Sequence, residues 1–180
     1  MEDLKLISRV LVFGDKRAYE SLVVKYQSSV RRFLLHLSGG DKMLSDDLAQ
    51  EAFVKAYLQL GSFRSMAKFS TWITGIAYHL YIDHYRKQQR EQEYISENAT
   101  FAKGFTSADK FDAIHDVEVA LQGLSPSERA VVLLFYIDDM EIKNICDTLK
   151  MPAGSVKSHL HRAKNKMKNF FENERNIWLQ

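Results

Sequence analysis

Proline, glycine and cysteine are scarce in this 180-residue sequence, and each shortage excludes a class of structure. Two prolines and eight glycines are too few for the many turns of a typical β-sheet protein, so long helices are favoured. The single cysteine, Cys146, excludes a disulfide within the chain and fits a reducing compartment. The sequence therefore predicts an all-α protein without disulfide bonds.

Long apolar segments are also missing. The longest apolar run is Ala130–Ile137, eight residues, whereas a membrane-spanning helix needs about 20. The N-terminus, MEDLKLISRV, has neither the basic start nor the apolar stretch of a signal peptide. We therefore expect a cytoplasmic protein.

The usual signatures of catalysis are absent as well. His159 and His161 lie two residues apart in a predicted helix, so they point about 200° apart and cannot share a metal. No pairing of a histidine with Cys146 or with the acids has the spacing of metal ligands either. No phosphate-binding glycine loop or nucleophile elbow is present either. We expect no enzymatic activity, no metal, no cofactor and no small-molecule substrate.

Helical periodicity is what the first half of the chain does contain. The glycine pair at 39–40 ends one amphipathic helix. Ser45 precedes two acids and is the expected N-cap of the next helix, which runs to about Leu60. A further helix is expected to start near Ser70 and to end at about Arg86.

The composition becomes polar and aperiodic after Lys87, which predicts a linker between two units. We assign residues 1–90 to a first small helical domain, 91–110 to a flexible linker and 111–180 to a second small helical domain.

The second unit has the pattern of a helix-turn-helix. Ser125 and Glu128 form an expected capping box, and the apolar run that follows is expected to be a buried helix rather than a strand. After the break at Met151-Pro152, an apolar stripe predicts a second helix with these inward residues: Val156, Leu160, Ala163, Met167 and Phe170. Its other sides are basic, and a helix-turn-helix seats such a helix in the DNA major groove. A solvated helix without a nucleic-acid partner is the alternative, since the net charge is only +2.

The segment from Leu124 to Lys164 resembles region 4 of extracytoplasmic-function (ECF) sigma factors, in the sigma-70 family of bacterial RNA polymerase. The resemblance lies in Gly154-Ser155-Val156-Lys157-Ser158 and in His161-Arg162-Ala163. It implies that this domain reads the minus-thirty-five promoter element, with these residues facing DNA: Ser155, Lys157, Ser158, His159, Arg162 and Lys164. His159 stands where the family usually has arginine. Lys150 stands where it often has glycine, and a left-handed backbone there would cost about 1 kcal/mol.

The first domain carries a second resemblance. Residues 46–53, DDLAQEAF, resemble region 2.2 of the same family, which docks on a coiled coil of the polymerase β′ subunit. This implies polymerase-binding residues on one broad face: Asp47, Gln50, Glu51 and Val54. Residues 68–73 and 76–86 resemble regions 2.3 and 2.4. They imply a site for the non-template strand of the minus-ten element: Lys68, Phe69, Trp72, Tyr78, His79, Arg86 and Lys87.

Core packing is the competing interpretation for two of these aromatic residues. Phe69 and Trp72 both fit an apolar interior, and we expect Trp72 to be at least partly core. His79 stands where the family commonly has asparagine, so the resemblance does not say which base this position reads.

The resemblance as a whole implies an alternative sigma factor that directs promoter-specific transcription initiation. Its implied partners are promoter DNA and core RNA polymerase, contacted through the β′ coiled coil and the β flap. It also implies an anti-sigma factor, often membrane-anchored, that covers the same surfaces. A helix-turn-helix regulator that does not depend on polymerase is the alternative. The region 2 signatures argue against it, because a repressor would not need them.

Overall fold

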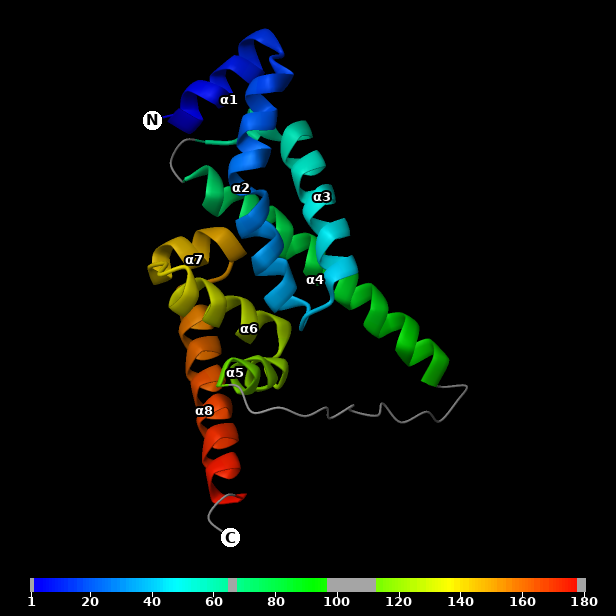
Figure 1. Cartoon of the computed structure of the whole chain (residues 1–180), viewed down its shortest axis with the longest axis vertical. Helices are drawn as coiled ribbons and strands as arrows, with labels where there is room; N and C mark the ends of the chain where they lie inside the picture. The colour runs from blue at the N-terminus through cyan, green and yellow to red at the C-terminus, as the bar shows by residue number, and fades with distance from the viewer. Residues whose placement is uncertain (1, 65–67, 97–112, 178–180) are drawn as a thin grey trace.

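Helices make up every regular element of the part of the chain that the structure describes. The computed structural model describes residues 2–64, 68–96 and 113–177, and these ranges contain no strand (Figure 1). The elements are α1 (Glu2–Phe13), α2 (Lys16–Leu37), α3 (Lys42–Leu58), the 3-10 turn η1 (Leu60–Ser62), α4 (Phe69–Ser96), α5 (Ala113–Gln122), α6 (Pro126–Val132), the π-helical segment η2 (Leu133–Ile137), α7 (Ile142–Leu149) and α8 (Ala153–Ile177). Within the same ranges, no helix is long and apolar enough to span a membrane. The predicted all-α class is confirmed.

The first four helices form a bundle around a shared apolar core. α2 packs against α1, α3 and α4, and α3 also packs against α4. Leu22, Leu34 and Ile73 are fully buried inside this bundle. The carboxylate of Asp15 caps α2 by accepting hydrogen bonds from two backbone N–H groups of its first turn. For α2, the N-cap and the buried apolar face therefore both indicate the same helix.

The start of α3 differs from the prediction. Asp41, not Ser45, is the N-cap, and its carboxylate accepts a hydrogen bond from the backbone N–H of Leu44. Ser45 lies inside the helix, fully buried, and its hydroxyl donates to the backbone carbonyl of Asp41. The prediction of Ser45 as the cap is wrong because an aspartate comes first after the glycine pair. Starting the helix there adds a turn.

The end of α4 also differs from the prediction. We expected the helix to stop near Arg86, but it continues to Ser96. The added residues include no glycine or proline, and lysine, arginine, glutamine and glutamate all favour helix without needing tertiary contacts. Lys87 and Glu91 also form an ion pair one helical turn apart, at 4.0 Å. Residues 91–96 of the assigned linker are therefore helical, and the rest of it lies outside the described residues.

The second set of helices contains both predicted landmarks. The hydroxyl of Ser125 accepts from the backbone N–H of Glu128, and the carboxylate of Glu128 accepts from the backbone N–H of Ser125. The capping box is confirmed. The apolar run Ala130–Ile137 is helical, as predicted, with its last five residues in η2. α8 packs against α5, α6 and α7.

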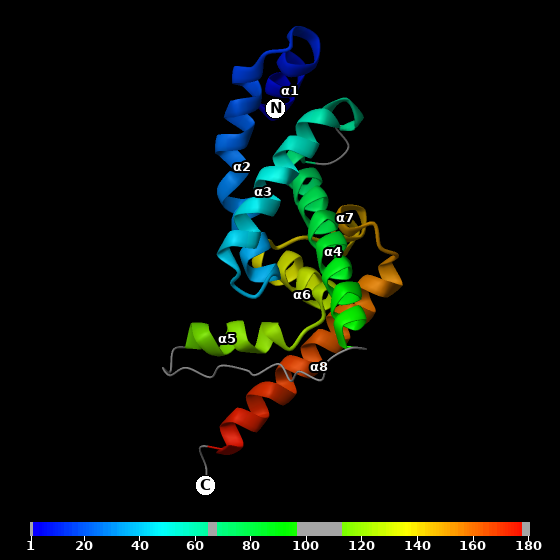
Figure 2. The ribbon, with the colours of Figure 1, turned by 90° about the vertical axis from the view of Figure 1, so that its right-hand side faces the viewer.

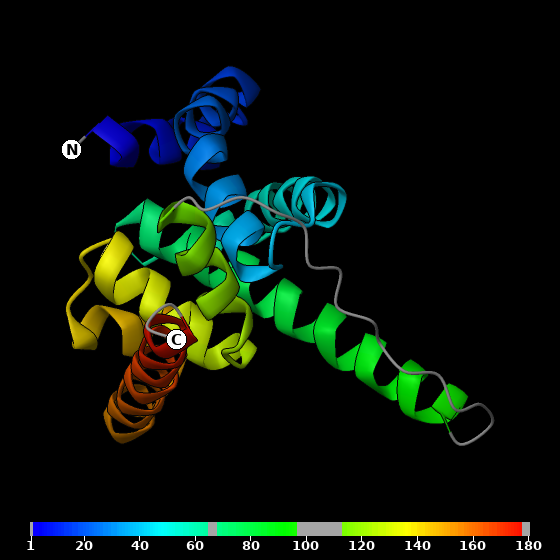
Figure 3. The ribbon, with the colours of Figure 1, turned by 60° about the horizontal axis from the view of Figure 1, so that its bottom comes forward.

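The two sets of helices pack against each other. α7 lies against α4, and α6 lies against α2 (Figures 1 and 2). Buried apolar side chains from both sets form one continuous cluster. The end of α4 and the end of α8 project from this body in different directions (Figure 3). The two units predicted from the sequence therefore touch along a shared boundary.

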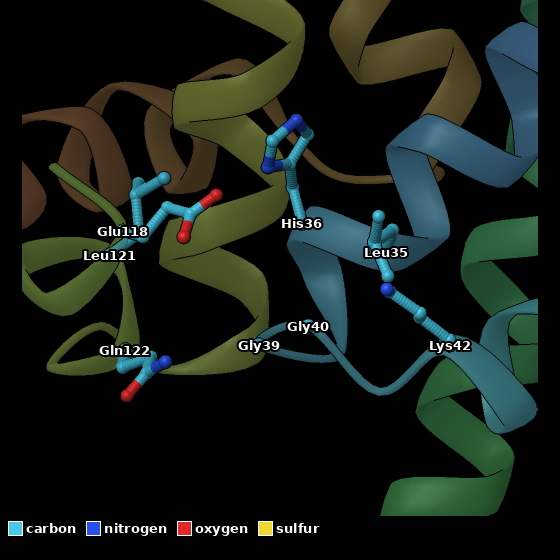
Figure 4. A pocket seen from close by; sticks show the side chains of 8 residues that line it. All are labelled: Leu35, His36, Gly39, Gly40, Lys42, Glu118, Leu121 and Gln122. Carbon is cyan, nitrogen blue, oxygen red and sulfur yellow. The ribbon is translucent and has the colours of Figure 1, made fainter. Parts of the chain in front are cut away.

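A cavity of about 250 Å³ marks one part of this boundary (Figure 4). It lies between the end of α2 and α5, and its lining residues are Leu35, His36, Gly39, Gly40, Lys42, Glu118, Leu121 and Gln122. Because its walls come from both units, the cavity exists only while the units are together.

Candidate nucleic-acid and partner interfaces

α7 and α8 form the predicted helix-turn-helix. Leu149 on α7 and Val156 on α8 are buried, which holds the two helices together on their apolar sides. Lys150 ends α7 in a left-handed conformation with φ of 52°. The backbone N–H of Met151 then donates to the carbonyl of Cys146 at 3.0 Å, which closes the turn. The left-handed backbone considered from the sequence is present, and a lysine there is strained.

α8 turns its basic side toward solvent. Val156 and Ala163 are fully buried on its inner side, where the sequence put the apolar stripe. Four of the six predicted DNA-facing residues are exposed: Lys157, Ser158, Arg162 and Lys164. Ser155 and His159 are half-buried at the edge of this surface. Exposed cations on the second helix of a helix-turn-helix are placed to contact phosphates. We call these six residues the α8 front.

A buried carboxylate on α6 holds two cations of α8. The side chain of Glu128 is only 4% exposed, and Oε2 accepts from Nζ of Lys166 at 2.7 Å. Its Oε1 accepts from Nε of Arg162 at 3.3 Å. Burial raises the pKa of Glu128, but the hydrogen bonds from Lys166 and Ser125 outweigh it and lower the pKa to about 2. Glu128 therefore stays charged and fixes the rotation of α8 relative to α6.

Arg162 is held from a second direction by His159. Nη2 of Arg162 lies 3.1 Å from Nδ1 of His159, and arginine has only donors, so the imidazole accepts. Burial and the nearby Arg162 both lower the pKa of His159, against an opposing effect of Glu128. A neutral imidazole is thus favoured. The family's arginine at position 159 would place a second cation beside Arg162. Histidine here instead orients Arg162.

Two predicted single-strand contacts of α4 belong wholly or partly to the core. Phe69 is 1% exposed, and its ring packs against Tyr26, Phe63 and Trp72 at centroid distances of 5.4, 5.9 and 5.7 Å. In this conformation Phe69 cannot stack on a base. Its prediction as a surface contact is corrected, because a ring at the start of α4 closes the end of the bundle. Trp72 is half-buried, as expected.

Tyr78 and His79 are covered by the second set of helices. Tyr78 is 3% exposed, and its hydroxyl lies 3.2 Å from the hydroxyl of Ser127 on α6. His79 is half-buried, and its Nε2 is buried without a hydrogen-bond partner among the described residues. Burial and Lys150 lower the pKa of His79. The two residues lie together on α4, as predicted, but Tyr78 faces α6 and His79 lies near Lys150 at the end of α7.

The predicted cations of α4 remain at the surface. Lys68, Arg86 and Lys87 are exposed, the first before α4 and the others midway along it. Lys87 pairs with Glu91 in an exposed ion pair, which contributes little stability and leaves the ammonium group accessible. These cations flank the covered Tyr78 and His79 on either side in the sequence.

The predicted polymerase-binding residues of α3 share an exposed surface: Asp47, Gln50, Glu51 and Val54. Val54 is 60% exposed and Leu58, one turn further on, is 77% exposed. A groove of about 720 Å³ runs beside them between α2 and α3, and Gln50 and Val54 are among its lining residues. An ion pair between Arg31 and Asp46 crosses it. The surface combines acids, an amide and exposed apolar groups, which suits a basic, partly apolar partner helix.

Two residues important to the arrangement were not singled out from the sequence. Arg129 is 8% exposed and donates to the backbone carbonyls of Leu37, Leu121, Gln122 and Leu124. Gly75 lies inside α4, where a Cβ would come within 2.7 Å of the carbonyl oxygen of Thr148. An isolated glycine in a long helical pattern is the available signal for such a close approach. A lone arginine before an apolar run carried no comparable signal.

Family models match both units of the chain. The Sigma-70 region 2 model matches residues 22–91, and the Sigma-70, region 4 model matches residues 114–167. The first range includes α3 and most of α4, and the second includes the capping box, α7 and the basic part of α8.

Curated relatives extend this similarity over most of the chain. The RNA polymerase sigma-H factor of Pseudomonas aeruginosa is 30% identical, over 91% of this chain and 90% of that protein. The ECF RNA polymerase sigma factor SigW of Bacillus subtilis is 29% identical, over 86% of this chain and 89% of that protein. Among solved structures, the sigma factor RpoE of Bartonella quintana, crystallised with the anti-sigma factor NepR, has a TM-score of 0.69 and 20% identity, covering 86% of this chain and 96% of that chain. That likeness is one of fold.

Proposed function

Because this chain belongs to the extracytoplasmic-function group of the sigma-70 family, and so directs RNA polymerase to promoters, we propose how its surfaces divide that work. The α8 front would read the minus-thirty-five element. α4 would bind the non-template strand of the minus-ten element, and α3 would hold core polymerase. The observation that carries the proposal is an exposed basic helix on a helix-turn-helix, in a chain that also matches region 2.

Duplex recognition is proposed for the α8 front. Lys157, Arg162 and Lys164 would contact phosphates, which positions the helix without reading sequence. Ser158 would reach base edges, and Ser155 and His159 would do so from the rim of the surface. Arg162 is already oriented by Glu128 and His159, so little side-chain freedom would be lost on binding.

Single-strand capture is proposed for α4. The exposed cations Lys68, Arg86 and Lys87 would hold the strand's backbone, and Trp72 would offer part of its ring to a base. Tyr78 and His79 would join this site only after the second domain moves away, since both are covered now. Phe69 would support Trp72 from the core.

Polymerase binding is proposed for the exposed surface of α3. The acids Asp47 and Glu51 would pair with basic groups of the β′ coiled coil, and Val54 would bury apolar area against it. Contact with the β flap is proposed for the second domain. This division needs no catalytic group, so the chemistry would remain in the polymerase active site.

The domain boundaries are part of the same proposal. Residues 1–90 and 111–180 would act as two modules, and the segment between them would set the promoter spacing that both can reach together. Two weak contacts on one tether gain a high effective concentration only when the spacing suits. We also propose a cytoplasmic protein and control by an anti-sigma factor. The sigma factor of Bartonella quintana was crystallised with such a partner.

Reconstituted transcription on a random promoter library tests this function. With core polymerase, the chain should select a defined set of starts that share two short boxes at one spacing. A pull-down with core polymerase should retain the chain, and Val54→Asp should weaken retention while Lys5→Ala, on α1, should not. If no transcription start site depends on the presence of the chain, the proposal is overturned. Selection of duplex sites without polymerase retention would instead favour the helix-turn-helix regulator.

A further inference from the structure

α1 is fixed to α2 through the carboxylate of Asp3, in its first turn. Oδ1 of Asp3 accepts from Nζ of Lys25 at 2.6 Å, and Oδ2 accepts from the hydroxyl of Tyr26 at 2.5 Å. The Asp3 side chain is only 23% exposed. Burial raises the pKa of Asp3, but the hydrogen bonds from Lys25 and Tyr26 outweigh it and lower the pKa. Asp3 therefore stays charged at neutral pH, and a charged acceptor strengthens its bond to Tyr26.

The ring of Tyr26 belongs to the aromatic cluster at the start of α4. Its centroid lies 5.4 Å from that of Phe69. Phe69 in turn lies 5.7 Å from Trp72, and Phe63 packs against both of them at 5.9 and 5.3 Å. Rings at these distances attract one another, and the inner ring, Phe69, is 1% exposed. Because close packing leaves a buried ring little room to shift, its position depends on the rings on either side.

One continuous set of contacts thus leads from α1 to Trp72. It begins at Asp3 and passes through the hydroxyl and the ring of Tyr26. It then passes through Phe69 and ends at the half-buried ring of Trp72. The starts of α1 and α4 lie at the same end of the first bundle (Figures 1 and 2). The surfaces proposed above do not use α1, so they do not account for these contacts.

We propose that Asp3 is a positioning residue for single-strand capture: it fixes the ring of Trp72 through the rings between them. The proposal rests on the proposed function of α4 and adds α1 to that site. A ring that is already held in one orientation loses less side-chain freedom when a base stacks on it. Asp3 acts only through the other side chains, because a carboxylate repels the phosphates of a DNA strand.

Glu2 offers a matched control within the same turn of α1. It also pairs with Lys25, at 3.6 Å, but its side chain is 82% exposed. An exposed ion pair contributes little stability. Glu2→Ala therefore removes the same charge as Asp3→Ala from the same end of the helix, and it leaves the hydroxyl of Tyr26 bonded to Asp3.

Two substitutions break the contact from its two ends. Asp3→Ala removes the acceptor, and Tyr26→Phe removes only the hydroxyl and keeps the ring. Trp72→Ala removes the ring that is proposed to stack on the base. Each variant is made in the full chain, and Asp3→Ala is also combined with Trp72→Ala. Circular dichroism checks that every variant retains its helix content.

Fluorescence anisotropy on the full chain bound to core polymerase measures the effect. The probes are the single-stranded downstream box and the duplex upstream box, taken from the starts that the wild type selects in the promoter library. Trp72→Ala should weaken single-strand binding by about tenfold. Asp3→Ala and Tyr26→Phe should each weaken it by about fivefold and leave duplex binding within about twofold of the wild type. Glu2→Ala should stay within about twofold on both probes.

The double variant shows whether Asp3 acts through Trp72. With Trp72 already replaced, Asp3→Ala should cause no further loss of single-strand affinity, because the ring that Asp3 positions is gone. A merely structural role of Asp3 would instead give the same loss in both backgrounds, and that result would overturn the proposal.

A second readout follows the ring of Trp72 directly. The chain has two tryptophans, so Trp178→Phe leaves Trp72 as the only one. In this background, the steady-state fluorescence anisotropy of Trp72 should fall in Asp3→Ala and in Tyr26→Phe, since a less restrained ring rotates more freely. It should not change in Glu2→Ala.

Unchanged single-strand affinity in Asp3→Ala and Tyr26→Phe would overturn the positioning role, as would an equal loss in Glu2→Ala. If Asp3→Ala loses helix content, Tyr26→Phe carries the comparison alone. A wild type that selects no starts, or whose complex with polymerase does not bind the single strand, would overturn the proposed function itself. Binding by the wild type without a loss in the Asp3 and Tyr26 variants would overturn the positioning role only.

Discussion

The two proposed DNA surfaces of this chain differ in a way that their sequences do not show. On α8, Lys157, Arg162 and Lys164 face solvent. On α4, Tyr78 is 3% exposed and its hydroxyl meets Ser127 of α6. Both surfaces are helix faces that combine polar and apolar character. Covering an aromatic face lowers the free energy of the folded chain, whereas burying unpaired cations raises it. Packing therefore covers the aromatic face of α4 and leaves the basic face of α8 exposed.

Two arginines of the second domain sharpen this comparison. Arg162 shares one carboxylate and keeps its side chain 55% exposed. Arg129 is 8% exposed and satisfies its guanidinium with backbone carbonyls alone. A cation can therefore be buried here only where acceptors surround it. Residue type alone does not separate a binding arginine from a structural one.

The largest expected effect is on stability, from Arg129. Arg129→Met would leave buried carbonyls at the α5–α6 turn and at the end of α2 without donors. We expect a loss of about 3 kcal/mol in the free energy of unfolding, measured by urea denaturation. Arg129→Lys keeps the charge but loses the planar guanidinium group. Its free energy of unfolding should therefore lie between those of the wild type and Arg129→Met. A loss below about 1 kcal/mol for Arg129→Met would show that water replaces these bonds.

The next largest effect is on DNA binding by the α8 front. Arg162→Ala should weaken duplex DNA binding by about tenfold for every sequence and reduce the salt dependence by about one released ion. Changes at Ser155 or His159 should instead shift sequence preference. Fluorescence anisotropy at several salt concentrations measures the DNA affinity of the variants at all three positions. Lys5→Ala removes the same charge from α1 and should leave affinity nearly unchanged. Uniform weakening by all three α8 variants would contradict the assigned roles.

A smaller effect is expected at the turn between α7 and α8. Lys150 has a φ of 52°, so Lys150→Gly should raise stability by about 1 kcal/mol by relieving the left-handed strain. Lys143 lies on α7 in an ordinary helical position and is exposed. Lys143→Gly should lower stability by about 1 kcal/mol, so the two substitutions should have opposite signs. Thermal unfolding measures both. The same sign for both would exclude strain at Lys150.

The smallest effect is a pH dependence of the covered surface. The pKa of His79 is lowered by burial and then by Lys150, with further lowering from Lys55 and Arg86 and an opposing effect of Asp83. The folded chain therefore resists protonation of His79, whereas the unfolded chain takes up this proton near the ordinary histidine pKa of 6.5. Stability should be retained above that pH and should fall as the pH decreases below it.

The contribution of His79 to this pH dependence can be isolated by substitution. His79→Asn should remove part of the acid loss seen by urea denaturation between about pH 7 and about pH 5.5. The pKa of His159 is also lowered. His159→Asn therefore measures the contribution of His159 to the same acid loss of stability. If His79→Asn leaves the pH profile unaltered, His79 is not held neutral at the boundary.

The helices and their chemistry were readable from the sequence wherever the signal was local. The capping box at Ser125 and Glu128, the break before α8 and the basic side of α8 were all predicted. The cap of α3 was missed because two candidate residues lie within one turn, and the earlier, Asp41, starts the helix. The prediction ended α4 ten residues too early, near Arg86 instead of Ser96. The added residues are mostly polar, so they form a helix without the apolar periodicity on which the prediction depended.

The sequence by itself determined the all-α class, the helix-turn-helix and which faces of α3 and α8 are charged, since capping, helix propensity and periodicity depend on residues within a few positions of one another. Only the tertiary structure decided that Phe69 closes the first bundle, that Arg129 is surrounded by carbonyls and that Gly75 admits α7. Those outcomes depend on which atoms from distant segments come into contact. The spacing of residues along one helix holds no record of such contacts.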